Sequence, residues 1–421
     1  MNQERKQLMK TYSPALRVLA VVLAFACIAA AADATPSKHK ISTFDAPGAG
    51  TGSGQGTLAI SINPAGKITG LTRDANLVRH GFLRDKHGKF TVFDDPNAGT
   101  ASGQGTRAYS TNPKGATTGY YTDSSGVDHG YVRHPDGTIK NFDAPDAGTG
   151  AGQGTFPWGV GMINPAGAIT GWYVDSNNAA HGFVRAPDNT ITEFDVPGDS
   201  GGTVPYGGIN AAGTTTGYYC DSSNCYGFLR SPKGHFTTFS VSGAINGTAA
   251  ESINAAGATT GWWSDANSAY HGFVRDPHGK IITFDPSGAG TGSGQGTIPW
   301  SINDEGTISG QYQDSNGVYH GFVRAADGKI TEYDAPGAGT GSGQGTQPSG
   351  INNSKAITGD YIDAGGVYHG FLANGFSDLE YWDILPEASG TFNDREPINA
   401  PGATTAVPRA TTRWPIATLP E

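Results

Sequence analysis

The 421-residue chain is poor in cysteine, with three such residues, and in charged side chains, which make up 15% of it. Cys27 lies in an apolar N-terminal run, which leaves Cys220 and Cys225 for the rest of the chain. A catalytic thiol needs an activating histidine nearby. Most of the chain is made of repeated units, described below, and the unit that holds these two cysteines is the one without the histidine that the other units carry. Because a turn sequence separates them, we expect a local disulfide across a hairpin in an oxidising compartment.

Long apolar runs are equally scarce. One run, Val18 to Ala32, follows four basic residues and ends in Ala32-Asp33-Ala34, an order that predicts a secretory signal peptide over residues 1–34. The run is shorter than the roughly 20 residues that a membrane span requires, and Phe25 does not fit a lipoprotein signal at Cys27. We therefore expect a secreted protein, extracellular or periplasmic, without membrane insertion.

Basic side chains are outnumbered by acidic ones, 27 to 37, which gives a net charge of −10. Residues 1–34 hold four basic and two acidic side chains, so their removal would leave a net charge of −12. An acidic surface of this kind argues against nucleic acid or an anionic membrane as partner.

Helical periodicity is absent from the repeats, which excludes helical repeat proteins. Instead, a His-Gly-aromatic triplet recurs every 45 to 52 residues and defines seven units. An aromatic-Asp pair recurs in phase with it, from Phe44-Asp45 to Trp382-Asp383, and an asparagine marks a third recurring site. The triplets begin at His80, His129, His181, His271, His320 and His369, and Tyr226-Gly227-Phe228 replaces the missing copy.

Each unit divides into four short apolar or aromatic runs separated by turn sequences, which predicts four antiparallel strands. Seven such units are typical of an all-β fold, a β-propeller with seven four-stranded blades. We expect the propeller over residues 35–384 and a Pro/Thr-rich tail over residues 385–421 that holds a degenerate partial eighth repeat. Ile41–Asp45 is an extra copy of the fourth strand, without the three strands that precede it in a full unit. It predicts that the ring closes by pairing of this strand with the C-terminal blade. The alternative is a ring of eight blades whose last blade is completed by this strand.

The recurring phrase Ile-Asn-x-x-Gly, Thr-Gly, Asp-x-x-Gly-x-x-His-Gly-Phe resembles the HAF repeats of extracellular bacterial repeat proteins, over about residues 41–384. Those repeats read His-Ala-Phe, whereas this chain reads His-Gly-Phe or His-Gly-Tyr, so it is similar to a divergent branch. The resemblance implies an exported, propeller-like repeat protein and implies no activity.

The recurring polar residues are explained by the fold rather than by chemistry. Triplet histidines one blade apart cannot share a metal ion, and the Asp-x-x-Gly turns each offer a single carboxylate, too few for calcium. The Gly-rich arms, such as Gly48 to Thr57, lack the lysine and the helix of a phosphate-binding loop and are interpreted as connectors. We expect no metal, no cofactor and no catalytic set.

Two positions vary between units that are otherwise alike, and both are rich in aromatic residues. One lies in the first strand of each unit, expected to be the innermost strand, and the other follows the glycine of the second strand. If the first strand lines a central channel, these side chains surround its mouth and could stack on sugar rings or an apolar ligand. The candidate ligand-binding residues are Tyr109, Trp158, Tyr206, Trp300, Trp172 and Trp262.

These features favour a non-catalytic, monomeric binding module whose partner is a glycan, another cell-surface polymer or a surface protein. A structural protein of the extracellular matrix or envelope is the first alternative. A propeller glycan hydrolase or lyase is the second, because Glu251 and Asp360 occupy the variable positions. Core packing is the competing explanation for the aromatic residues.

Overall fold

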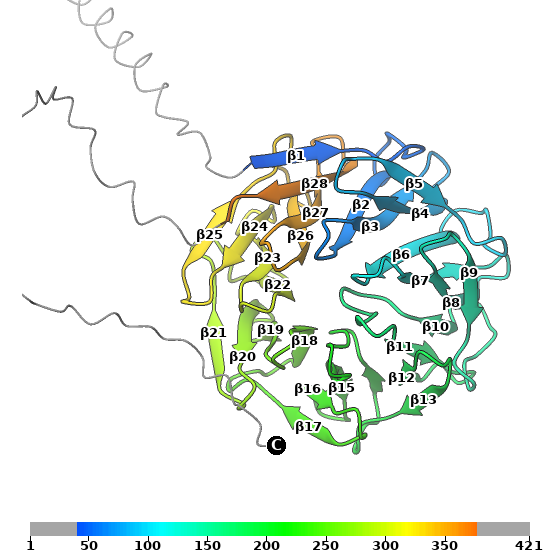
Figure 1. Cartoon of the computed structure of the whole chain (residues 1–421). Coiled ribbons are helices and arrows are strands. Elements are labelled where there is room, and N and C mark those ends of the chain that lie inside the picture. Colours follow the sequence, from blue (N-terminus) through cyan, green and yellow to red (C-terminus); the bar gives the residue numbers. More distant parts are fainter. Residues whose placement is uncertain (1–39, 377–421) are drawn as a thin grey trace, which may run out of the picture. The chain divides into compact units, whose positions relative to one another are not determined.

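The computed structural model describes residues 40–376, and the regular elements of that range are 28 β-strands. Consecutive strands pair as antiparallel neighbours in groups of four, and the seven groups stand as blades around a common centre (Figure 1). The predicted seven-bladed all-β propeller is confirmed. No helix in residues 40–376 is long and apolar enough to cross a membrane. The predicted signal peptide and C-terminal tail lie outside the described residues.

In blades 1 to 6 the strands run from the centre of the ring to its edge in chain order, and in blade 7 the first strand of the chain is the outermost (Figure 1). Blade 1 holds β2 (Gly56–Ile62), β3 (Ile68–Arg73), β4 (Arg79–Arg84) and β5 (Phe90–Phe93). Blade 2 holds β6 (Gly105–Thr111), β7 (Thr117–Thr122), β8 (Asp128–Arg133) and β9 (Ile139–Phe142). Blade 3 holds β10 (Gly154–Phe156), β11 (Ile169–Val174), β12 (Ala180–Arg185) and β13 (Ile191–Phe194).

The remaining blades follow the same plan. Blade 4 holds β14 (Gly202–Val204), β15 (Thr215–Cys220), β16 (Cys225–Arg230) and β17 (Phe236–Phe239). Blade 5 holds β18 (Thr248–Ile253), β19 (Thr259–Ser264), β20 (Tyr270–Arg275) and β21 (Ile281–Phe284). Blade 6 holds β22 (Gly296–Ile302), β23 (Ile308–Gln313), β24 (Tyr319–Arg324) and β25 (Ile330–Tyr333), and blade 7 holds β26 (Gly345–Ile351), β27 (Ile357–Ile362), β28 (Tyr368–Asn374) and β1 (Lys40–Phe44).

Short polar motifs form the turns between strands. In the turn between the second and third strands of blade 1, one carboxylate oxygen of Asp74 accepts the backbone N–H groups of Asn76 and Val78, each at 2.8 Å. In the turn between its first two strands, Asn63 Oδ1 accepts from Ala65 and Lys67 at 3.0 and 2.9 Å. The Asp-x-x-Gly carboxylates are therefore engaged by their own turns, as side chains of this type commonly are.

The His-Gly-aromatic triplet builds the middle of each blade. The aromatic residue is fully buried in all seven units, as at Phe82. The glycine is required because the ring of the outermost strand packs over it: a Cβ at Gly81 would lie 2.9 Å from the ring of Phe93, its direct partner in β5. A larger residue here would push the outer strand off the blade.

The ring closes with seven blades. The N-terminal strand β1 pairs antiparallel with β28, from Lys40 opposite Asn374 to Phe44 opposite Gly370, and the two lie side by side in Figure 1. The predicted closure is thereby confirmed, and the eight-blade alternative is wrong because β1 already fills the outer edge of β28. The strand expected around Trp382 lies outside the described residues.

A closed circle of hydrogen bonds joins all seven blades at one end of their innermost strands. The side-chain amide of each recurring asparagine donates to the backbone carbonyl of the next one, at 3.0 to 3.2 Å, and Asn352 donates back to Asn63. We call this the asparagine ring; its members are Asn63, Asn112, Asn164, Asn210, Asn254, Asn303 and Asn352.

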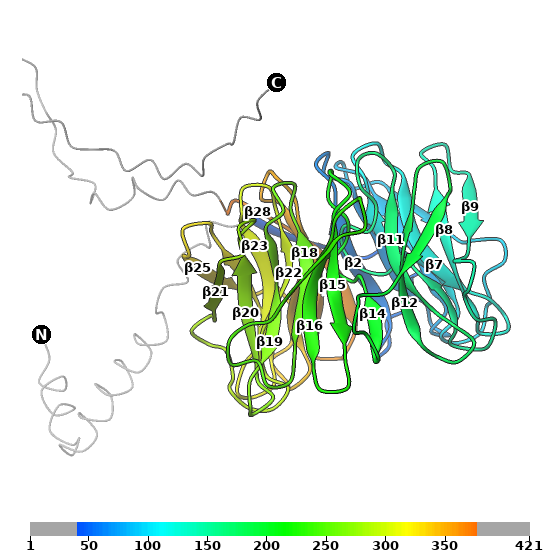
Figure 2. The ribbon, with the colours of Figure 1, turned by 90° about the horizontal axis from the view of Figure 1, so that it is seen from below.

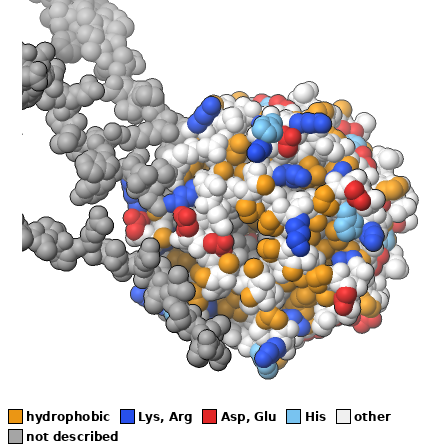
Figure 3. All heavy atoms as spheres, in the orientation of Figure 1, with side chains coloured by type: hydrophobic (Ala, Val, Ile, Leu, Met, Phe, Trp, Pro, Cys, Tyr) orange, Lys and Arg blue, Asp and Glu red, His pale blue; other side chains and the backbone are white. Residues whose placement is uncertain are grey.

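The strands run between the two faces of the ring, as the view turned by 90° shows (Figure 2). On the face seen in Figure 1, hydrophobic side chains gather around the centre, and basic and acidic side chains are interspersed around them (Figure 3).

Candidate ligand-binding site at the centre of the ring

The variable position of the innermost strand coincides with an irregularity in that strand. In five blades the pairing register between the first and second strands shifts at this residue, which is the mark of a β-bulge, as between Ala59 and Ser61. In blades 3 and 4 the short strands β10 and β14 end two residues before it. A bulge redirects a side chain out of the regular alternation, so this residue can point toward the ring axis.

The seven side chains at this position line one cavity of about 370 Å³, to which all seven blades contribute. We call them the mouth residues: Ile60, Tyr109, Trp158, Tyr206, Glu251, Trp300 and Ser349. Arg73 and Arg79, which also line the cavity, flank the turn between β3 and β4. The asparagine ring begins the opposite turns, so the cavity lies at the other end of the strands.

Trp158 is the centre of an aromatic group in this cavity. Its ring lies 5.9 Å from that of Tyr109 and 6.0 Å from that of Tyr206, measured between centroids. Tyr206 in turn lies 6.5 Å from Trp300. Trp158 remains 37% exposed, so an aromatic face is open to a ligand.

Four of the six predicted ligand-binding residues line the cavity, namely Tyr109, Trp158, Tyr206 and Trp300. Trp172 and Trp262 do not. Trp172 is directly paired with Phe156, stacks on it at 5.8 Å and packs behind Trp158. Trp262 donates its indole N–H to Glu251 at 2.7 Å. Both follow the second-strand glycine, the position at which Leu71 and Tyr120 do line the cavity, so a direct ligand contact by either tryptophan stays a prediction.

Three arginines in the lining escaped the sequence analysis: Arg73, Arg79 and Arg107. Each stands at a repeat position where no other blade has arginine, so the search for recurring or aromatic positions passed over them. The available signal was their register, because Arg73 and Arg79 are directly opposed on β3 and β4.

Glu251 is the only acid among the described residues that line the cavity. Its Oε1 accepts from Trp262, whereas its Oε2 is buried and has no hydrogen-bond partner among the described residues. Burial raises the pKa of this carboxyl to about 8, so it is protonated at neutral pH. Asp360, the second carboxylate considered, is also buried with a pKa raised to about 8, but it does not line the cavity.

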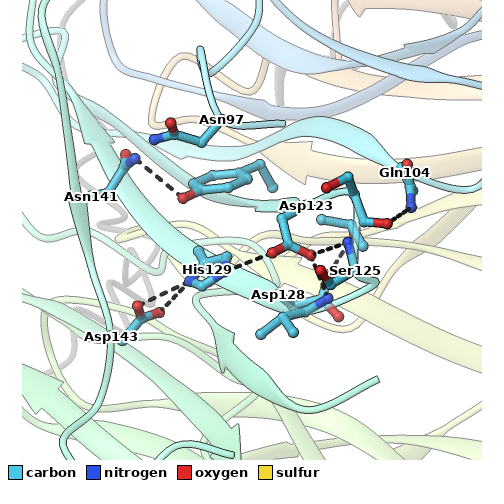
Figure 4. Close-up of polar contacts among 12 residues, drawn as sticks. Asn97, Gln104, Asp123, Ser125, Asp128, His129, Asn141 and Asp143 are labelled. Atoms are coloured by element: carbon cyan, nitrogen blue, oxygen red, sulfur yellow. Dashed lines mark hydrogen bonds and ion pairs between the residues drawn. The ribbon is translucent and has the colours of Figure 1, made fainter. Parts of the chain in front are cut away.

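The triplet histidines lie in the outer half of the blades, away from the cavity. In each case Nδ1 hydrogen-bonds the aspartate of the aromatic-Asp pair at 2.7 to 2.9 Å, and Nε2 lies 3.4 to 3.9 Å from the aspartate of the neighbouring turn. Figure 4 shows His129 between Asp123 and Asp143. In residues 40–376, no three His, Cys, Asp or Glu side chains gather as a metal site would require.

The Gly-rich arms are tied in place by a glutamine. Gln55 Oε1 accepts from the N–H of Gly52 at 2.7 Å, and Gln55 Nε2 donates to Ala75 O at 3.1 Å. Gly50 leaves room for this side chain, since a Cβ there would lie 2.4 Å from Gln55 Oε1. Equivalent glutamines are Gln104, Gln153, Gln295 and Gln344. The backbone N–H group of the arm that could have bound a phosphate is thus already hydrogen-bonded to the glutamine.

Blade 4 departs most from the repeat. Cys220 and Cys225 are directly opposed on β15 and β16, and the structure joins them by a disulfide. Tyr226 takes the place of the triplet histidine, and Ser240 that of its aspartate. The disulfide occupies the register that Arg73 and Arg79 hold in blade 1.

No family model matches the chain, and no curated protein matches it, so the resemblance to HAF repeats stays a prediction. Among solved structures, the chain is similar to a catalytically inactive virginiamycin B lyase from Staphylococcus aureus, with 16% identity, a TM-score of 0.48 and coverage of 79% of this chain and 99% of the other. It is also similar to a streptogramin B lyase, at 15% identity and a TM-score of 0.49, over 80% of this chain and 97% of that one. A third is the β-propeller domain of the trilobed protease from Pyrococcus furiosus, at 10% identity and a TM-score of 0.46, over 77% and 95%. These likenesses are distant, and we take neither activity nor ligand from them.

Proposed function

We propose that this protein is an exported, non-catalytic binding protein that holds a carbohydrate or another ring-bearing cell-surface polymer in the central cavity. The observation that carries the proposal is the convergence of the mouth residues, five different residue types at seven equivalent positions, on one cavity. Protein sites for small ligands are concave and lined by aromatic residues with a few polar groups among them. A purely structural repeat protein would not require this position to differ from blade to blade.

The test is binding of the purified protein to a glycan array, repeated on the double variant Trp158→Ala, Trp300→Ala. Two stacking faces are lost, so we expect affinity to fall about tenfold or more, with little change in melting temperature because Trp158 is 37% exposed. Tyr226→Ala is the matched control, since this half-buried aromatic residue lies outside the cavity. Binding that survives the double variant, or no binding to any glycan, would contradict a carbohydrate site here.

A glycan hydrolase or lyase is the second candidate, and Glu251 is the observation that favours it. A carboxyl group that is protonated at neutral pH can act as a general acid. Hydrolysis also needs a second carboxylate about 5–9.5 Å away, and Glu251 is the only acid among the described residues of the lining. Release of reducing ends from a bound glycan, lost in Glu251→Gln, would establish the enzyme over the binding protein.

A further inference from the structure

One side of the cavity carries three positive charges from two neighbouring blades. Arg73 and Arg79 belong to blade 1, and Arg107 belongs to the innermost strand of blade 2. Burial, and after it the charges of Arg107 and Arg73, lower the pKa of Arg79. The three guanidinium groups are thus close enough to repel one another.

Neutral oxygen atoms hold these arginines in place. Arg73 Nη1 donates to Gly54 O at 3.2 Å, and both Arg79 and Arg107 donate to Gly103 O, Arg107 at 2.7 Å. Arg107 also donates to Thr122 Oγ1 at 2.7 Å. Among the described residues, none of the three forms an ion pair with a carboxylate. A guanidinium that is bonded only to neutral oxygen atoms keeps the capacity to bind a carboxylate or sulfate in a bidentate manner.

The carboxyl groups near this charge form no ion pair with it among the described residues, although Asp128 lies within reach of the charges of Arg107 and Arg79, and Asp360 of that of Arg73. Asp128 is buried, its pKa is raised by that burial, and its carboxylate accepts from Thr122 Oγ1 at 2.5 Å instead of pairing with an arginine. Glu251 lies on blade 5 and is protonated at neutral pH. The cavity is therefore positive in a chain whose net charge is −10.

The arrangement also carries a cost that the other blades avoid. Arg73 and Arg79 face each other directly on β3 and β4, and like charges at such positions destabilise a sheet. In the other blades these two positions never hold a like-charged pair; they hold Thr122 and Asp128, Val174 and Ala180, Cys220 and Cys225, Ser264 and Tyr270, Gln313 and Tyr319, and Ile362 and Tyr368. Retention of an unfavourable pair only beside the cavity is typical of a site in which a ligand relieves the repulsion.

We propose that the ligand is an acidic saccharide, whose acid group contacts Arg73, Arg79 and Arg107 while its ring lies against the aromatic mouth residues. This inference rests on the proposed binding function and adds the chemical class of the ligand. A neutral glycan would leave the three clustered cations without an ion-pair partner among the described residues.

The experiment compares trigalacturonate with its methyl ester, which has the same sugar rings but no negative charge, by isothermal titration calorimetry. We expect trigalacturonate to bind at least tenfold more tightly than the ester. Arg79→Gln and Arg107→Gln should each weaken trigalacturonate binding at least tenfold and weaken ester binding much less. Lys86→Gln is the matched control, because it removes the same charge from an exposed position in the turn between β4 and β5.

The melting temperature of the free protein separates a binding role from a structural one. If the arginines serve a ligand, Arg79→Gln relieves repulsion and the melting temperature stays the same or rises, as is usual when a strained functional site is simplified. A fall in melting temperature that accompanies unchanged trigalacturonate binding would overturn the inference.

The remaining outcomes distinguish the two proposals. Equal binding of the acid and the ester overturns the acidic ligand and leaves the carbohydrate site standing. If neither sugar binds, the carbohydrate site fails, and sodium sulfate then tests the cations alone: sulfate that raises the melting temperature of the wild type but not of Arg79→Gln supports an acid-binding cavity. If sulfate leaves the melting temperature of the wild type unchanged, the acid-binding cavity is overturned as well.

Discussion

Two sets of seven equivalent residues on the innermost strands differ completely in how they vary. The asparagine ring has the same residue in every blade, and each member is buried and bonded to the next blade. The mouth residues, three positions earlier in blades with a regular strand, include aliphatic, aromatic, hydroxyl and acidic side chains. The comparison shows that blade-to-blade bonding through the asparagines holds the ring and leaves the mouth position, a few residues earlier on the same strand, free to vary.

The two positions differ in the regularity of the backbone. Because the mouth residue occupies a bulge, its side chain is released from the close packing between strands, and a change there does not propagate into the ladder. The insertions in blades 3 and 4, around Gly159 and Gly207, extend this freedom and allow Trp158 and Tyr206 to reach the centre.

Breaking the asparagine ring should have the largest effect. Asn303→Ala removes the bond from Nδ2 to Asn352 O at 3.2 Å and the two bonds that Oδ1 accepts from Glu305 and Thr307 at 3.1 and 2.9 Å. Buried groups that lose their partners are costly, so we expect the free energy of unfolding to fall by about 3–4 kcal/mol. Ser349→Ala, at the mouth position of the next blade, should change stability by about 0.5 kcal/mol or less. Equal losses in urea titrations of the two variants would refute the comparison.

Glu251 is the mouth residue with the strongest expected dependence on pH. Its pKa is about 8 in the folded protein against an ordinary value of 4.5. Between these values the folded protein keeps a proton that the unfolded chain has lost, so stability falls as the pH rises from about 4.5 to 8. The surrounding groups are Trp262, which donates to the carboxyl, and Tyr206 and Tyr218, whose pKa values are raised by burial and then by Glu251.

Glu251→Gln keeps the acceptor for Trp262 and removes the ionisation. Unfolding measured at pH 5 and pH 8 should therefore show the variant gaining about 2–3 kcal/mol on the wild type between the two values. Asp360→Asn is the companion variant, because Asp360 has the same raised pKa outside the cavity. An identical pH profile for wild type and Glu251→Gln would show that the carboxyl is not buried as described.

The features of the fold and of the site that could be predicted from the sequence are those that become visible when the repeated units are aligned. The blade number, the closing strand and the mouth position all appear when the units are aligned, because each is a regular feature or a departure at one aligned site. Arg73, Arg79 and Arg107 do not, since each occurs once and their proximity depends on cross-strand register and on two blades meeting. The sequence also did not show that Trp172 and Trp262 lie beside the cavity lining rather than in it, because aligned variation does not tell what each side chain packs against.

The histidine and aspartate pairs are a third repeated set, and removing one should have the smallest effect. The hydrogen bond with Asp143 raises the pKa of His129 above 6.5, although partial burial opposes it. A raised histidine pKa contributes stability that is fully present below about 6.5 and is lost as the pH rises through the folded value. His129 is about a quarter exposed, so after solvent screening we expect His129→Gln to cost about 0.5 kcal/mol at pH 6 and less at pH 9. Thermal unfolding at both pH values checks this against His87→Gln, an exposed histidine; an equal loss at both pH values would mean that His129 acts through the packing of its ring on Tyr121.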